Sequence, residues 1–355
     1  MKTETNHKRG FDMIGDAQHL LRLAKEWMKQ GNTTVAFQLL NEALKLKEVT
    51  EDKLVKGEIS KEMGRAYMQT GQWDLAEDAY QEATAIFLEY EEYRGAAESV
   101  RNLANMKFQL GNFSDSNSLC ETAVNWATKS GDYQLRATIL NTLGAIKAVE
   151  GKQRESINIF RLCLSDFRSV GNPLRQAYTQ HNIGLAQLEL CDYAESRTSL
   201  EEALALALEQ KDLNLVSLCY QNIAKLHLKT GDLLAARTLI TVARDIINTL
   251  NSPSMQADLA IVEAESYRLA GDRNRAQEVL ERCLAQAREH GLMQHEAEIL
   301  SDLGQLCAEL GKYEEARAHL ETSISLFRKT GGGLLAKAET RLKDLESAQG
   351  WINKI

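Results

Sequence analysis

The sequence predicts an all-α fold, a right-handed superhelical α-solenoid of eight helix-turn-helix repeats with a C-terminal capping helix. Two observations predict it: a glycine recurs every 40 residues, and small residues stand at fixed distances on both sides of it. A third is composition, because the 355 residues include only 2 prolines and are rich in good helix formers. Such a period is typical of a solenoid and not of one compact core.

The recurring glycine marks a hinge between two helices. It follows a helical run, and glycine easily adopts the left-handed conformation that commonly ends a helix. Small residues occur seven positions before the hinge, for example Gly144, and five positions after it, for example Ser156. Two antiparallel helices can therefore approach closely. The hinge residues are Gly31, Gly71, Gly111, Gly151, Cys191, Gly231, Gly271 and Gly311, and nothing in the sequence accounts for the cysteine.

A second breaker recurs twenty residues after the hinge, so each repeat has two helices and two turns. These breakers are Gly131, Gly171, Asn251, Gly291 and Gly331, with Glu91 and Lys211 in less regular repeats. The predicted organisation is a disordered tail over 1–10, eight repeats over 11–331, and a capping helix with a tail over 332–355. The repeats span about 11–50, 51–90, 91–130, 131–170, 171–210, 211–250, 251–290 and 291–331.

Leucine spacing predicts which face of a second helix packs inward. In the segment 196–208, Leu200, Leu204 and Leu208 recur every four residues, whereas Arg197 and Glu201 lie on another face. We expect the three leucines to be buried together.

Two segments, 63–83 and 303–324, resemble the tetratricopeptide repeat. Each has a Met-Gly or Leu-Gly pair late in its first helix, a turn glycine followed two residues later by an aromatic residue, and alanines in its second helix. The resemblance covers about residues 15–331, and 40-residue units are similar to those of kinesin light chains, Pins-type adaptors and bacterial Rap-like and MalT-like regulators. It implies a protein that binds other proteins or peptides.

Charge and motifs argue against several other functions. A net charge of −8 and a pI near 5.6 disfavour nucleic-acid binding. No apolar stretch of about 18 residues could cross a membrane and no secretory signal is seen, so we expect a cytoplasmic protein. The 6 cysteines and 7 histidines are scattered, and no phosphate loop or nucleophile motif occurs. We therefore expect buried structural cysteines, no metal, no cofactor and no enzymatic activity.

The first helices of a solenoid line its concave surface, so their shared face is the candidate binding site. Residues 13, 9, 6 and 2 positions before the hinge lie on that face. Asparagine occupies the second of these positions in Asn102, Asn182 and Asn222, and Asn141 stands beside it in the fourth repeat. The predicted peptide-binding groove comprises Arg101, Asn102, Asn105, Asn141, Tyr178, His181, Asn182, Gln221, Asn222 and Lys225.

A side-chain amide offers both a donor and an acceptor, which suits the backbone of an extended peptide. The resemblance agrees, because peptide-binding repeats of the kinesin light chain and Pins kinds use asparagines at this place. The other interpretation is that these asparagines bond to a neighbouring helix or face water.

Charge along this face is uneven. The first repeat is basic, whereas the last two are acidic, so a peptide of opposite polarity would be steered into one orientation; a solvated surface explains the same residues equally well. Lys61, Arg65 and Arg101 approach a carboxylate clamp, but Glu58, Glu62 and Glu98 dilute it. The uneven charges are Arg22, Lys25 and Lys29 against Asp258, Glu265, Glu298, Asp302 and Glu309.

The function that these patterns favour is an adaptor that binds a peptide segment of a partner protein in its concave groove. Two alternatives remain open. One is a regulatory sensor that binds a small signal or a signalling peptide, and the other is a structural subunit that assembles with itself.

Overall fold

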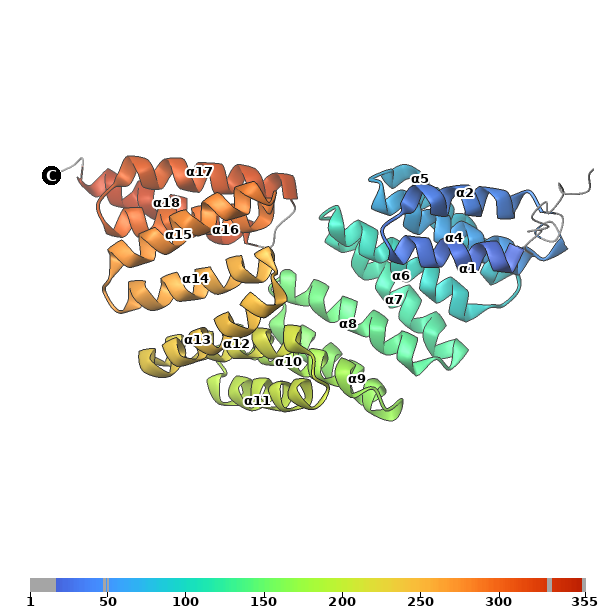
Figure 1. The fold of residues 1–355 in the computed structure, drawn as a ribbon, viewed down its shortest axis with the longest axis horizontal. Coiled ribbons are helices and arrows are strands. Elements are labelled where there is room, and N and C mark those ends of the chain that lie inside the picture. Colours follow the sequence, from blue (N-terminus) through green and yellow to red (C-terminus); the bar gives the residue numbers. More distant parts are fainter. Residues whose placement is uncertain (1–16, 47–48, 50, 331–333, 353–355) are drawn as a thin grey trace, which may run out of the picture. The chain divides into compact units, whose positions relative to one another are not determined.

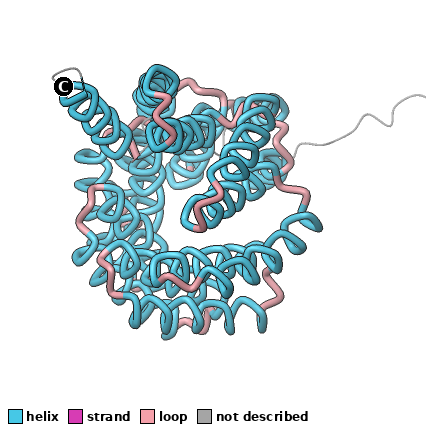
Figure 2. Tube along the Cα trace, turned by 90° about the vertical axis from the view of Figure 1, so that its left-hand side faces the viewer, coloured by secondary structure: helices cyan, strands magenta, loops and turns pink. Residues whose placement is uncertain are grey.

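The computed structural model describes residues 17–46, 49, 51–330 and 334–352, and within them it contains helices and connecting loops but no strand (Figures 1 and 2). The helices form eight consecutive pairs and a last single helix, as the sequence predicts. The predicted disordered tail and Gly331 lie outside the described residues. The pairs are α1 (Ala17–Lys29) with α2 (Thr33–Leu44), α4 (Lys53–Gln69) with α5 (Trp73–Glu89), α6 (Tyr93–Gln109) with α7 (Phe113–Ser130), α8 (Tyr133–Val149) with α9 (Gln153–Ser169), α10 (Pro173–Glu189) with α11 (Tyr193–Glu209), α12 (Leu213–Thr230) with α13 (Leu233–Leu250), α14 (Pro253–Leu269) with α15 (Arg273–Glu289), and α16 (Met293–Glu309) with α17 (Tyr313–Thr330), followed by α18 (Leu335–Ile352).

The chain forms two compact units. Unit 1 comprises Met1–Met106 and Thr122–Asp132, and unit 2 comprises Lys107–Glu121 and Tyr133–Ile355. In unit 2 each first helix contacts the next one along the row α8, α10, α12, α14, α16 and α18, and each second helix packs between first helices. We call the face that this row presents the first-helix face.

The hinges adopt the left-handed conformation that the sequence predicts, and Cys191 adopts it as well. Its φ is 62°, close to the 77° of Gly151 in the preceding repeat. The substitution therefore keeps the turn and accepts the strain of a side chain in this region. Glu91, Lys211 and Asn251 at the second breaker also have positive φ.

Replacing Cys191 by glycine is expected to raise the free energy of unfolding by about 0.5–1 kcal/mol, because relief of left-handed strain exceeds the extra entropy of the unfolded chain. Gly151→Cys is the matched control and should lower the free energy of unfolding by about 1 kcal/mol, because it places a side chain in the left-handed conformation. No steric clash adds to this loss, because a Cβ at position 151 would meet no neighbour within 4 Å. Urea unfolding measures both. Destabilisation by Cys191→Gly would mean that the thiol makes a contact stronger than the strain.

Close approach of paired helices accounts for the small residues around each hinge. A Cβ added to Gly144 on α8 would lie 2.6 Å from Cε1 of Phe160 on α9. On the other side of the contact, Oγ of Ser156 donates a hydrogen bond of 2.8 Å to the Gly144 carbonyl. Ser196 and Gly184 repeat this bond at 2.8 Å in the next pair. The serine on α9 or α11 is thus small enough to let the two helices approach closely, and its hydroxyl adds a hydrogen bond between them.

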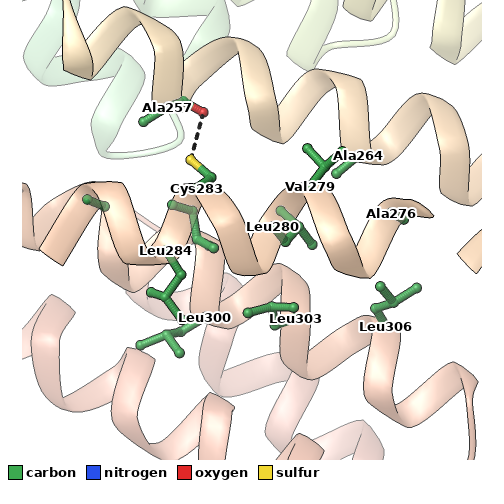
Figure 3. Close-up of a cluster of buried hydrophobic side chains, with 12 residues drawn as sticks. Ala257, Ala264, Ala276, Val279, Leu280, Cys283, Leu284, Leu300, Leu303 and Leu306 are labelled. Carbon is green, nitrogen blue, oxygen red and sulfur yellow. Dashed lines mark hydrogen bonds between the residues drawn. The ribbon is translucent and has the colours of Figure 1, made fainter. Parts of the chain in front are cut away.

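Buried hydrophobic side chains of successive helices form local core clusters. Figure 3 shows one of these clusters, in which Leu280 and Leu284 of α15 lie between α14 and α16, and Sγ of Cys283 bonds to the carbonyl oxygen of Ala257 at 3.9 Å. Five of the six cysteines are buried like this one, as expected, and Cys191 is exposed.

The predicted leucine face of α11 is partly wrong. Leu200 is fully buried, but Leu208 is 51% exposed, and the inward positions of the last two turns are Ala203 and Ala207. These alanines pack with Leu215, Val216 and Cys219 of α12, and Leu204 is partly buried against the same cluster.

Candidate functional site

Side-chain amides join the first helices of unit 2 across the first-helix face. Nδ2 of Asn182 on α10 donates a hydrogen bond of 3.2 Å to Oδ1 of Asn141 on α8, 41 residues earlier. Both side chains are partly exposed. Each primary amide has two N–H donors and an oxygen with two lone pairs. The bond therefore holds the two amides in place while leaving each of them further donor and acceptor capacity.

The same connection continues from α10 to α12. Nδ2 of Asn222 lies 2.9 Å from Nε2 of His181, which is 6% exposed, and 2.9 Å from the carbonyl oxygen of Leu218. Burial lowers the pKa of His181 to about 4, and the ammonium group of Lys225 contributes in the same direction. The imidazole is thus neutral near pH 7, and its Nε2 accepts the bond from Asn222. We call the pairs Asn141–Asn182 and His181–Asn222 the amide ladder.

Tyr178 connects the same helices at their beginning. Its hydroxyl donates a hydrogen bond of 3.2 Å to Oδ2 of Asp212, whose Oδ1 accepts 2.9 Å from the backbone N–H of Leu215. Asp212 caps the N-terminus of α12. Tyr178 therefore fixes the start of α12 relative to α10 and is not solely a contact residue.

Gln221 and Lys225 lie one turn apart on α12, and the two side chains lack different kinds of partner. Gln221 is 2% exposed, and its Oε1 has no hydrogen-bond partner. Lys225 is partly buried and forms no ion pair within the described part of the chain. Burial lowers the pKa of Lys225, against the opposing effect of Asp258, Glu298 and Glu189.

The remaining predicted residues form a separate group in unit 1. Nη2 of Arg101 donates a 3.0 Å bond to Oδ1 of Asn102, which is 8% exposed. Asn105 is partly buried one turn later on α6. These three residues share helix α6 in unit 1, whereas the amide ladder belongs to unit 2.

Unit 1 has a polar hollow of about 740 Å³ whose charges neutralise one another. Nζ of Lys61, which is 4% exposed, lies 2.7 Å from Glu58 and 2.6 Å from Glu98. Nη1 of Arg65 lies 2.7 Å from Glu62. The weak carboxylate clamp noted in the sequence is thus occupied by the protein's own glutamates.

Most acidic residues of the last repeats also have partners. Asp258 lies 3.4 Å from Nε2 of His295, and Asp302 lies 2.7 Å from Nη1 of Arg341 on α18. Glu265 and Glu309 both bind Arg268, at 2.7 Å each. Glu298 has no ion pair among the described residues, and burial raises its pKa, with Asp258 adding to the effect.

Sequence reasoning missed the basic partners of this acidic stretch. His295 and Arg341 lie outside the four positions, 13, 9, 6 and 2 residues before the hinge, that define the candidate binding face. The repeat period could have indicated Arg341, because this residue stands 40 residues after Ser301 and so occupies the same repeat position. In the structure, Arg341 also donates a 2.7 Å hydrogen bond to Ser301. The repeat thus continues into the capping helix.

The described part of the chain contains no group of three or more His, Cys, Asp or Glu side chains placed to hold a metal ion. None of its helices is long and apolar enough to cross a membrane.

Family comparisons agree with the helix pairs. A tetratricopeptide repeat model matches residues 257–329, and a second one matches residues 61–86. With the observed helix-turn-helix repeats, these matches make the chain a tetratricopeptide-type repeat protein. A search of the curated proteins finds no match to this sequence.

Solved structures share the fold over most of the chain. A Rap protein complexed with competence and sporulation factor has a TM-score of 0.66 at 16% identity, covering 94% of this chain and 89% of that one. Aspartyl phosphate phosphatase F from Bacillus subtilis has 0.66 at 12%, covering 90% and 96%. The apo form of the quorum sensor NprR from B. thuringiensis has 0.69 at 15%, covering 88% and 87%. At these identities the likeness establishes the fold alone.

Proposed function

We propose that this protein is a scaffold that binds an extended peptide on the first-helix face of unit 2. The observation that carries the proposal is the first pair of the amide ladder, Asn141–Asn182, which places two partly exposed amides on the adjacent first helices α8 and α10. An extended peptide presents alternating backbone N–H and C=O groups, and amides can bind both. Their mutual bonds fix their orientation before the peptide arrives, which reduces the entropy lost on binding.

The comparisons support a peptide as the ligand. One structure with this fold contains the competence and sporulation factor, and another is a quorum sensor. The bound peptide is therefore either a segment of a partner protein, as in an adaptor, or a free signalling peptide, as in a sensor. Self-assembly is the remaining alternative, and the mass of the protein in solution tests it. The proposal involves no catalytic step, cofactor or nucleic acid.

Substituting both members of the first ladder pair, Asn141→Ala with Asn182→Ala, is expected to weaken peptide binding by about tenfold or more, because two amide contacts to the peptide backbone are lost. Stability should fall by about 1 kcal/mol, since both partners of one part-buried bond disappear together but Asn182 also has a side-chain hydrogen bond with His181. The measurement is retention of a pool of short synthetic peptides by the full chain in size-exclusion chromatography, with mass spectrometry of the retained peptides.

The matched control is Thr138→Ala with Thr198→Ala, which removes two exposed hydroxyls that bond only within their own helices. Equal retention by the Asn141→Ala/Asn182→Ala variant and the wild type would contradict the proposal. Asn222→Ala is a poor test, because it also removes the donor to buried His181 and is expected to lower stability. A pull-down from source-cell lysate with the same variants distinguishes a protein segment from a free peptide.

A further inference from the structure

The chain carries two copies of one charge arrangement, spaced 200 residues apart, and only the first copy is internally neutralised. Lys25 on α1 corresponds to Lys225 on α12, and Glu98 on α6 corresponds to Glu298 on α16. The spacing equals five repeats, so each pair occupies the same position of its repeat. The surroundings of the two copies can therefore be compared residue by residue.

In unit 1 the lysine has two carboxylate partners. Nζ of Lys25 lies 3.0 Å from Glu58 and 3.7 Å from Glu62 on the next first helix. In unit 2 the corresponding residues are Asp258, which is one methylene shorter and binds His295, and Val262, which has no charge. Lys225 consequently has no ion pair among the described residues.

Glu298 lacks the ion-pair partners of Glu98 in the same way. Glu98 in unit 1 lies 2.6 Å from Nζ of Lys61 and 3.5 Å from Nε of Arg94. The corresponding residues in unit 2 are Ile261 and Gln294, neither of which is charged. Glu298 is partly buried and makes no ion pair within the described residues.

Partly buried charges without partners cost stability, since desolvation is not offset by an opposite charge. Unit 1 shows that this repeat geometry can supply such partners from neighbouring helices. Unit 2 keeps both charges, on first helices separated by α14, and lacks the close ion-pair partners of each; only longer-range attraction remains, between Lys225 and Glu298 and from Asp258 to Lys225. A ligand with two opposite charges would supply both.

We propose that the peptide ligand binds with a carboxylate at Lys225 and a cationic group at Glu298. This inference rests on the proposed function and adds the chemistry and the direction of the ligand. Its carboxylate takes the place that Glu58 and Glu62 occupy at Lys25, and its cation takes the place of Lys61 and Arg94 at Glu98.

The test uses the full chain and three matched pools of short synthetic peptides: unmodified, amidated at the C-terminus, and acetylated at the N-terminus. Lys225→Met should weaken binding of the retained unmodified peptides by about tenfold or more, and Glu298→Gln should do the same, because each removes one charge-assisted contact. The controls are Lys211→Met and Glu314→Gln, which make the same changes of charge at exposed positions of unit 2. Both controls should bind as the wild type does.

The pools identify the source of each charge. Loss of retention on amidation assigns the carboxylate to the peptide C-terminus, whereas retention only of amidated peptides that contain Asp or Glu assigns it to a side chain. In the same way, loss of retention on N-terminal acetylation assigns the cationic group to the peptide N-terminus, whereas retention only of acetylated peptides that contain Lys or Arg assigns it to a side chain. Thermal melting verifies folding, and Lys225→Met should melt close to the wild type, because removing a desolvated charge offsets the lost attraction to Asp258, Glu298 and Glu189.

Two results overturn the inference. If peptides are retained but Lys225→Met and Glu298→Gln bind them as tightly as the wild type does, only this inference fails. If the wild type retains no peptide from any pool, the proposed function fails, and this inference fails with it.

Discussion

A leucine at position 144 is expected to lower the free energy of unfolding by about 3 kcal/mol or more, because it forces α8 and α9 apart. Even the Cβ of an alanine would stand 2.6–2.9 Å from three ring atoms of Phe160. Leucine adds three carbons beyond that point, and separating the helices also breaks the bond from Ser156 to the Gly144 carbonyl. Thermal and urea unfolding, followed by circular dichroism, measure the loss.

A compensating substitution tests the cause. Gly144→Ala combined with Phe160→Leu gives the fourth repeat the alanine and leucine that the seventh has at Ala264 and Leu280. This double variant should be more stable than the sum of its single variants predicts, since the two residues are in contact. A Gly144→Leu protein that unfolds at the wild-type midpoint would show that the assigned contact between α8 and α9 is wrong.

The second large effect is expected at Lys61. Lys61→Met should cost about 2 kcal/mol near pH 7, because it leaves Glu58 and Glu98 facing each other without their shared cation; their partial exposure keeps the loss below that of a fully buried pair. The matched control is Lys56→Met, which breaks a 2.6 Å pair with Glu82 at the surface and should cost less than about 1 kcal/mol.

The contribution of Lys61 should also depend on pH. Burial alone would raise the pKa of Glu58, but Lys61 and Lys25 outweigh burial and lower the pKa below its ordinary value of 4.5. The free energy that ionised Glu58 contributes to folding is therefore fully present above about pH 4.5. It is lost as the pH falls through the lowered pKa of Glu58. Burial alone would lower the pKa of Lys61, but Glu58 and Glu98 raise it above 10.5, so its contribution is lost only as the pH rises through that raised value.

Unfolding curves over this pH range check both statements. The difference between the wild type and Lys61→Met should be largest in the neutral range and shrink in acid. A variant as stable as the wild type at pH 7, with the same pH profile, would show that the network contributes nothing to folding.

The sequence predicts the features that local chemistry determines. The glycine hinges follow from backbone conformation, and the small residues around them follow from the close approach of two helices of one repeat. Contacts between repeats depend also on how successive helices tilt, and the sequence of a single repeat does not determine that tilt. The tilt brings together residues that occupy different positions of their repeats, such as Lys25 and Glu58, which form an ion pair between two successive repeats. For the same reason, the sequence could not decide whether Asn182 faces a ligand or a neighbouring helix; the structure shows the bond to Asn141.

The buried cysteines allow local unfolding of individual repeats to be measured, because each thiol can be alkylated only after its helix separates from the core. Burial raises the pKa of Cys163 and of Cys219 to about 12, so neither thiol reacts at neutral pH while its helix stays packed. Exposed Cys191 provides an internal reference for the rate of labelling. Because the other five thiols lie in five different repeats, mass-resolved alkylation records which repeat separates first and how a bound ligand slows it. The buried cysteines are Cys120, Cys163, Cys219, Cys283 and Cys307.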